Sequence, residues 1–328
     1  MTDFRATSLA DLRRLTAAPE TAPKALAGDA VWEVSAPVGR LEGAAAVRDG
    51  LLEPVRRALS SPFRRDKIFI GGQNIRAEGG QWVASVTHYV GNFTQPLFGL
   101  PPSGHLAFLR AGEFYRIGQD GRIAKAHIIL DLLDLARQAG RMPLPPSPGT
   151  EMLFPAPASH DGVLPAAGDG AASLALVERM LAELTGFDPA DFSSPAQTGE
   201  DGCWSENMLW YGPGGIGANH RWDGFVTDHR ASFLTAFPDR VGGNHYCRIG
   251  DGNYAAVSGW PSMTMTHRGP YLGQPATGRK LTLRVMDFYR CAAGRIAENW
   301  VLLDYIDLFA QMGRDLIGEA AALPGQSG

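Results

Sequence analysis

The sequence predicts an α+β fold in which one unit of N-terminal helices and a curved antiparallel sheet occurs twice. The first observation is a repeat: residues 294–313, GRIAENWVLLDYIDLFAQMG, match residues 121–140, GRIAKAHIILDLLDLARQAG, at ten of twenty positions. The second is a matching stretch upstream, where residues 97–116 resemble residues 271–290 and one residue is then lost in a turn. A length difference confined to a turn is typical of a structural repeat, because loops tolerate insertions.

Each unit is expected to begin with a helix. Near the N-terminus Ser8 is a candidate N-cap, and leucines follow at helical spacing. The same periodicity returns in residues 173–184, after a stretch rich in Pro and Gly that is expected to be irregular. Both units then show a short segment, a Pro/Gly-rich loop and an amphipathic helix. The predicted domains are residues 1–145, a linker at residues 146–172, and residues 173–320.

The second half of each unit is expected to be a sheet of three or four antiparallel strands. In residues 280–290, Leu283, Val285, Asp287 and Tyr289 fall on one face of an alternating pattern. Residues 295–303 are β-branched and aromatic enough for a partner strand, and residues 254–269 form a further strand, bent or bulged at Pro261. Helices laid over a strongly curved sheet would enclose a cone-shaped pocket.

Composition excludes several classes of protein. The chain has 328 residues, of which 45% are apolar, and a formal net charge of −4. A slightly acidic chain without a Lys/Arg-rich block is not expected to bind nucleic acid or a membrane surface. Its three cysteines have no CxxC spacing, which fits a reducing compartment, and a cytoplasmic location is expected.

One stretch of the second unit resembles a known family. The residues GPYLGQPATGRKLTLRVMDFYRCAAGRIAENWVLLD, at 269–304, are similar to the signature of SnoaL-like polyketide cyclases, which belong to the nuclear-transport-factor-2-like superfamily of α+β cones. The FPD at 237–239 and the loop at 212–217 also match the family pattern, whereas the first unit matches less well. The resemblance implies tandem domains that pack as an internal pseudo-dimer, with a small-molecule substrate, no cofactor, and a homo-oligomer as an open possibility.

Asp304 is the first catalytic candidate. In the cyclases that this chain resembles, the aspartate at this position is the general acid/base of an intramolecular aldol closure. An aspartate in an apolar pocket is desolvated, so its pKa rises toward neutral pH, where it can take up and return a proton. The alternative is structural, because an aspartate at a strand end is also a good helix N-cap.

The first unit carries weaker candidates. Asp131 is the counterpart of Asp304, and His127 stands where the second unit has Trp300. On one strand His127 and Asp131 would be about 13 Å apart, too far for a direct hydrogen bond. We expect the first unit to be the diverged, structural copy.

Three histidines of the second unit are further catalytic candidates. His229 lies at helical spacing between Phe225 and Phe233, where it would face a pocket or be a satisfied core histidine. His220 lies in a loop and His245 on a strand. Predicted pocket or binding residues are Trp300, Trp222, Asn219, Asp287 and Phe288. The histidines do not have metal-ligand spacing, so no metal site is expected.

These observations together predict an enzyme. We expect a cofactor-independent cyclase, isomerase or lyase that acts on a small carbonyl compound, with Asp304 as acid/base and a histidine that polarises the carbonyl or holds a water. One alternative is a hydrolase or hydratase that activates water. The other is a non-catalytic ligand-binding or assembly protein of the same fold.

Overall fold

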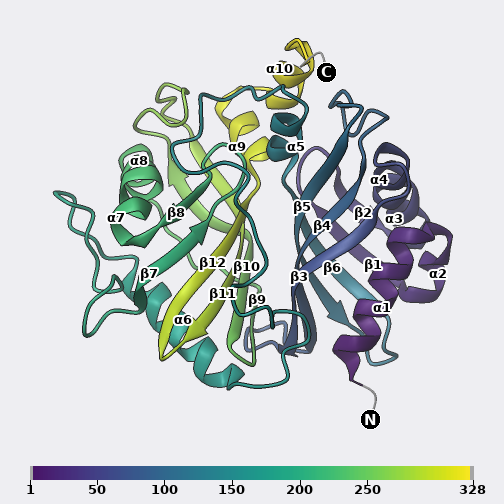
Figure 1. The fold of residues 1–328 in the computed structure, drawn as a ribbon, viewed down its shortest axis with the longest axis horizontal. Coiled ribbons are helices and arrows are strands. Elements are labelled where there is room, and N and C mark those ends of the chain that lie inside the picture. The colour runs from purple at the N-terminus through teal and green to yellow at the C-terminus, as the bar shows by residue number, and fades with distance from the viewer. Residues whose placement is uncertain (1–2, 326–328) are drawn as a thin grey trace.

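The computed structural model describes residues 3–325, so residues 1–2 of the first predicted domain lie outside the described part. The chain forms two units that share the order of their six strands and of most of their helices (Figure 1). They differ by two short helical segments in the first unit and a last helix in the second. This confirms the predicted α+β fold with a repeated unit. The first unit consists of α1 (Phe4–Ala17), η1 (Pro19–Thr21), α2 (Ala22–Ala25), β1 (Leu26–Val34), β2 (Gly39–Glu42), α3 (Gly43–Val47), η2 (Arg48–Leu52), α4 (Glu53–Ala58), β3 (Phe63–Gln73), β4 (Gln81–Asn92), β5 (Leu106–Ile117), β6 (Ile123–Leu130) and α5 (Leu132–Gln138).

The second unit follows a connection in which residues 139–169 form no helix or strand. It consists of α6 (Gly170–Glu183), β7 (Trp204–Tyr211), β8 (Ala218–His220), α7 (Arg221–Phe225), η3 (Val226–Arg230), α8 (Ala231–Ala236), β9 (Cys247–Asp251), β10 (Tyr254–Thr266), β11 (Lys280–Ala292), β12 (Arg295–Leu303), α9 (Tyr305–Met312) and α10 (Leu316–Ala322).

The two sheets differ from the prediction in size and in strand direction. Each has six strands, in the orders β2-β1-β6-β5-β4-β3 and β8-β7-β12-β11-β10-β9, and each is mixed rather than purely antiparallel. The reason is the short segment that precedes the Pro/Gly-rich loop in each unit. It forms a strand, β1 or β7, that pairs in parallel with the last long strand of its unit, as in Glu33 opposite His127 and Trp210 opposite Asn299.

Two local predictions have different outcomes. The strand around Pro261 is irregular as predicted, because the register of β10 against β11 shifts between Gly259 and Met263. The first helix begins earlier than predicted. Its N-cap is Asp3, whose side chain accepts a hydrogen bond from the backbone N–H of Arg5, and Ser8 is buried inside the helix.

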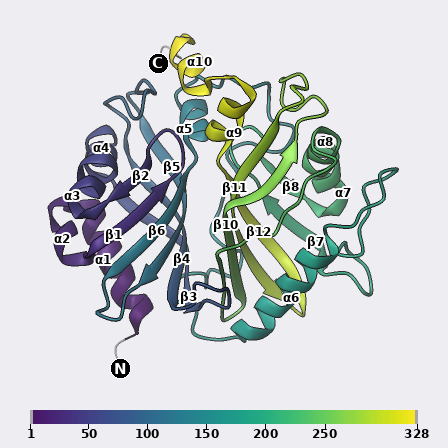
Figure 2. The ribbon, with the colours of Figure 1, turned by 180° about the vertical axis from the view of Figure 1, so that it is seen from behind.

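The sheets of the two units face each other in the middle of the molecule, and α1–α4 and α6–α8 lie on opposite outer sides (Figure 1). Figure 2 shows the same arrangement from behind. Large side chains of both sheets form one core between them; the rings of Phe114 and Phe288, for example, lie 5.4 Å apart. Because successive residues of a strand point to opposite faces, each sheet keeps its other face for its own helices.

In residues 3–325 no helix has the length and apolar character needed to cross a membrane.

Candidate active site

Asp304 lies at the contact between the two units. Its carboxylate begins α9 by accepting from the backbone N–H of Asp307 at 3.2 Å, and it pairs with Arg284 at 2.8 Å. The same carboxylate accepts from the backbone N–H of Ala36, which belongs to the first unit, at 3.2 Å. Burial raises the pKa of Asp304, and the charge of Arg284 opposes that rise.

Asp131 makes the mirror-image contacts. It begins α5 by accepting from the backbone N–H of Asp134, it pairs with Arg110 at 3.4 Å, and it accepts from the backbone N–H of Gly214 in the second unit at 2.9 Å. Each repeated aspartate therefore caps its own helix and holds the loop of the other unit. Burial raises the pKa of Asp131, while Arg110 lowers it and Asp134 raises it.

The second unit contains a cavity of about 170 Å³ between its sheet and its helices. The strand residues that reach it come from β7, β10, β11 and β12, and helices α6–α8 and the segment before β9 close the other sides. Asp304 is not among the residues that line it. The polar lining residues are Thr185, His229, Arg230, Arg240, His245, Ser262, Asp287, Tyr289 and Asn299.

Asp287 is the one carboxylate that lines this cavity. It is half-buried, and within residues 3–325 it has no ion-pair partner. Desolvation raises the pKa of Asp287 to about 7, while hydrogen bonds from the side chains of Asn299 and Tyr289 act in the opposite direction. A carboxylate with a pKa near neutrality is suited to both accept and return a proton.

Two histidines line the same cavity. His229 stacks on Trp210 with ring centroids 4.5 Å apart, and burial lowers its pKa to about 3, an effect to which Arg230 and Arg240 add. Burial also lowers the pKa of His245 to about 3, with smaller contributions from Arg248 and Arg76. Both rings are therefore neutral at pH 7. Because Arg248 donates to Nδ1 of His245 at 3.1 Å, that ring carries its proton on Nε2 and can donate from there.

Arg230 and Arg240 also line the cavity, and neither makes an ion pair within the described residues. Desolvation lowers the pKa of Arg230 to about 10, which leaves it charged at pH 7, and an Nη atom of its guanidinium is buried without a hydrogen-bond partner. The sequence analysis did not identify either arginine. Arg230 lies four residues and Arg240 fourteen residues after the start of η3, and nothing in the local sequence indicates that they lack carboxylate partners.

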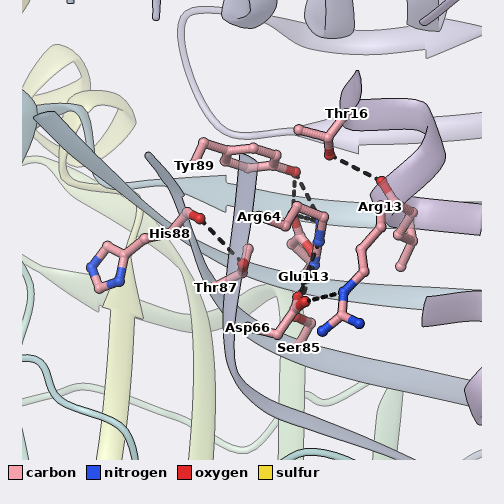
Figure 3. A network of polar contacts seen from close by, with 10 residues as sticks. Arg13, Thr16, Arg64, Asp66, Ser85, Thr87, His88, Tyr89 and Glu113 are labelled. Carbon is pink, nitrogen blue, oxygen red and sulfur yellow. Dashed lines mark hydrogen bonds and ion pairs between the residues drawn. The ribbon is translucent and has the colours of Figure 1, made fainter. Parts of the chain in front are cut away.

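The corresponding interior of the first unit is filled by an ion-pair network (Figure 3). Glu113 stands at the repeat position of Asp287, and its carboxylate accepts from Arg64 at 2.7 Å and from the hydroxyl of Tyr89 at 2.5 Å. Arg64 also donates to Ser85 and pairs with Asp66 at 3.0 Å. All of these side chains are buried or nearly so, and the space left beneath the helices of this unit is about 10 Å³.

Comparison with known proteins agrees with the duplicated architecture. The family model described as SnoaL-like polyketide cyclase matches residues 15–139 and residues 201–312, which together exceed half of the chain. The chain belongs to the SnoaL-like polyketide cyclase family. Among curated proteins no sequence matches it.

Several solved structures are similar to part of the chain. A putative hydroxylase, AclR, from Streptomyces galilaeus is 21% identical, with a TM-score of 0.34, and the match covers 44% of this chain and 98% of that one. A putative SnoaL-like polyketide cyclase from Jannaschia sp. is 12% identical (TM-score 0.32, 40% and 88% covered). An NTF2-like protein from Burkholderia xenovorans is 12% identical (TM-score 0.33, 44% and 97% covered).

Three of the residues predicted from the sequence as pocket or catalytic candidates, Trp300, Phe288 and His127, lie between the two sheets. Trp300 and Phe288 belong to the shared core, and Trp300 donates from Nε1 to the carbonyl of Pro155 at 2.9 Å. His127 is in the same layer, stacked on Tyr246 at 4.0 Å, and burial lowers its pKa to about 3. These side chains lie on the strand faces that meet the other unit.

The remaining predicted residues lie around the cavity without lining it. The side chain of Asn219 is buried and donates to Asp228 at 2.9 Å. Trp222 packs beside Phe225 with ring centroids 5.5 Å apart. His220 is exposed at the start of α7. Within residues 3–325 no group of three or more His, Cys, Asp or Glu side chains is arranged to hold a metal ion.

Proposed function

We propose that this chain is a cofactor-independent enzyme of the cyclase or isomerase type, that its cavity in the second unit is the active site, and that Asp287 is the general acid/base. One observation carries the proposal: Asp287 has a pKa of about 7 and faces a largely apolar cavity with no ion-pair partner in the described chain. We assign this role to Asp287 rather than Asp304 because the Asp304 carboxylate is occupied by Arg284, Asp307 and Ala36.

The reaction begins with ionised Asp287 removing a proton from the carbon next to a substrate carbonyl. The negative charge that develops on the carbonyl oxygen is stabilised by the charged Arg230 and Arg240 and by the Nε2–H of His245. Preorganised donors and cations in a site with little water are effective at this step. His229 is neutral and stacked, so it contributes a wall and a further donor or acceptor rather than a charge.

In a cyclisation, the enolate carbon then attacks a second carbonyl of the same molecule and forms the new C–C bond. The resulting alkoxide takes up the proton now held by Asp287, which returns to its ionised state. In an isomerisation, the proton goes instead to a different carbon of the same enolate. Both reactions conserve atoms and electrons, so neither requires a cofactor.

The cavity limits the substrate to a small compound. Its volume of about 170 Å³ is below the roughly 300–1,000 Å³ of pockets for drug-sized ligands. Phe225, Phe233, Leu283 and Val301 give it apolar walls. A compound of about one ring, with a carbonyl and an acidic neighbouring C–H, matches this space and its polar groups.

The test is proton exchange, which does not require the natural substrate. A panel of small β-dicarbonyl compounds is incubated with the protein in D₂O, and loss of the α-proton signal is followed by NMR. D287N is expected to lower the exchange rate by a factor of about 10²–10⁴, the usual contribution of a general base. Equal exchange by the wild type and D287N would refute the assignment, and D304N serves as the control outside the cavity.

The same variants separate catalysis from simple binding. A protein that only binds carbonyl compounds would show the same affinity in the wild type and D287N, measured by calorimetry, with no exchange in either. An enzyme would lose exchange in D287N while its cavity still takes the ligand.

A further inference from the structure

A second cavity, of about 390 Å³, lies against the first unit on the other side of its sheet. It is formed by β3, β4 and β5 together with residues 152–155 of the connection between the units and with the end of α5. Figure 3 shows His88 pointing away from Arg64, Tyr89 and Glu113, because neighbouring residues of β4 face opposite sides of the sheet. This cavity is therefore separate from both cone interiors.

Cationic side chains dominate its lining. Arg65, Lys67, Arg110 and Arg137 face one acidic lining residue, Asp134. Asp134 pairs with Arg110 and Arg137, and Asp131 pairs with Arg110 from behind, so the two arginines on that side are neutralised. On β3, Arg65 and Lys67 make no ion pair and no side-chain hydrogen bond within the described residues. A local excess of positive charge thus occurs on a chain whose net charge is −4.

His88 stands between these two sides. In the register of the sheet it is flanked by Arg65 on β3 and by Arg110 on β5. The side chain is 6% exposed, and its ring makes no hydrogen bond within the described residues. Burial, with the charges of Lys67 and Arg110, lowers the pKa of His88 to about 2, and burial with Arg65 and Arg110 lowers the pKa of Lys67. The ring nitrogens have no protein partner in the described chain and His88 lines the cavity, so they are available to a ligand bound there.

Apolar groups complete the cavity. Phe108 lies edge-on to His88, with ring centroids 6.2 Å apart. The guanidinium carbon of Arg110 lies 4.7 Å from the ring centroid of Phe154. Phe108, Met152 and Leu153 are 43%, 70% and 41% exposed, which is unusual for side chains of their size. The cavity therefore offers charge on one side and apolar surface beside it.

The fold does not require this arrangement, because the second unit lacks it. The corresponding segment of the second unit, residues 241–246 before β9, contains no lysine or arginine. In that unit Arg284 lies under Trp260 at 4.8 Å instead. The first unit thus has two cations without ion-pair partners among the described residues, Arg65 and Lys67, at a place where the second unit has no cation.

We infer that this cavity is a binding site for a small amphiphilic anion, with a phosphate or carboxylate head held by Arg65, Lys67 and His88 and an apolar chain or ring against Phe108, Met152 and Leu153. Arg65 and Lys67 are two residues apart on β3 and both line the cavity, so both can reach a single head group. The neutral ring of His88 supplies a hydrogen-bond donor to it. This site is independent of the proposed acid/base chemistry in the second unit.

The test is calorimetry on the full chain with hexyl phosphate, heptanoate and inorganic phosphate as probes at low salt. The wild type is expected to bind both amphiphiles more tightly than inorganic phosphate, and the two amphiphiles separate a phosphate head from a carboxylate head. R65Q/K67M is expected to weaken binding of the amphiphiles about tenfold or more, since charge-assisted hydrogen bonds are lost. The matched control K24M removes an exposed lysine elsewhere and should leave binding unchanged.

Other outcomes would overturn the inference. Equal affinity in R65Q/K67M and wild type would do so, as would the absence of any binding to the wild type. Loss of binding in R240Q but not in R65Q/K67M would place the anion in the cavity of the second unit. M152S should weaken hexyl phosphate but not inorganic phosphate; equal losses for both would contradict the apolar half of the site. Urea unfolding of each variant shows that the fold is intact.

Discussion

The cone interiors of the two units carry a carboxylate at the same repeat position, Glu113 on β5 and Asp287 on β11. One interior is filled, and the other contains a cavity. In the first unit Glu113 is matched by Arg64, and the interior is filled. In the second unit Asp287 has no such partner, and about 170 Å³ stays open. The segment before β9, which corresponds to the start of β3, has glycines at Gly242 and Gly243 and no arginine to match Arg64.

The difference concerns how each unit treats the carboxylate inside its cone. A buried carboxylate needs a partner, and the first unit supplies one at 2.7 Å. The second unit leaves its carboxylate desolvated and without an ion-pair partner in the described chain, which raises its pKa and suits it to the proposed proton transfer. We infer that the first unit serves as a scaffold that covers the sheet of the second.

The largest effect should come from breaking the closed interior. R64M leaves Glu113 buried without its cation, whereas Asp66 keeps its ion pair with Arg13. Removal of one partner of a buried ion pair costs about 3–5 kcal/mol. Urea unfolding of R64M should show a loss of that order. The double variant R64M/E113L should recover much of it, because no carboxylate is left unpaired at position 113. A single variant as stable as the wild type would show that the network does not stabilise the first unit.

The two repeated aspartates should affect stability by similar, smaller amounts. D131N and D304N each weaken an ion pair, a helix cap and a hydrogen bond to the other unit, and bonds to a charged group contribute about 1.5–3 kcal/mol. Urea unfolding should show comparable losses for both variants. A loss in D304N that is accompanied by complete loss of α-proton exchange, while D131N keeps its activity, would instead place the chemistry at Asp304.

The raised pKa of Asp287 should make the free energy of unfolding depend on pH. The folded-state pKa of Asp287 is raised to about 7, above the unfolded value of about 3.9. Between these values the folded state binds more protons, so this group makes stability fall as pH rises from about 4 to 7. D287N should remove that slope, which amounts to about 1–3 kcal/mol across the window. An unchanged slope in D287N would contradict the raised pKa.

Much of the fold could be predicted because the two units are still similar in amino-acid sequence. Apolar and polar residues alternate along the strands of residues 254–266 and 280–303. The bulge at Pro261 could be predicted because proline has no backbone N–H to donate to a neighbouring strand. The short strands β1 and β7 could not be predicted so readily. Each pairs in parallel with a strand distant in sequence, so no local hairpin turn marks it.

The site could be predicted only in part, and the reason is the same for each residue. Strand alternation separates the face of Leu283, Val285 and Asp287 from the face of Phe288, but it does not say which face meets the helices. The sequence therefore predicts pocket roles for Trp300 and Asp304, whereas in the structure Trp300 packs in the core between the sheets and Asp304 contacts the first unit. Whether Arg230 lacks a carboxylate partner depends on the tertiary fold, so no local pattern reveals it.

The most direct test of the central claim is the pKa of Asp287 itself. Carboxyl carbons labelled with ¹³C can be titrated by NMR in the wild type and in D287N, and the signal absent from the variant belongs to Asp287. We predict a midpoint of about 7 for that signal, with the α-proton exchange rate rising through the same pH. A midpoint of about 4, the ordinary aspartate value, would contradict the account.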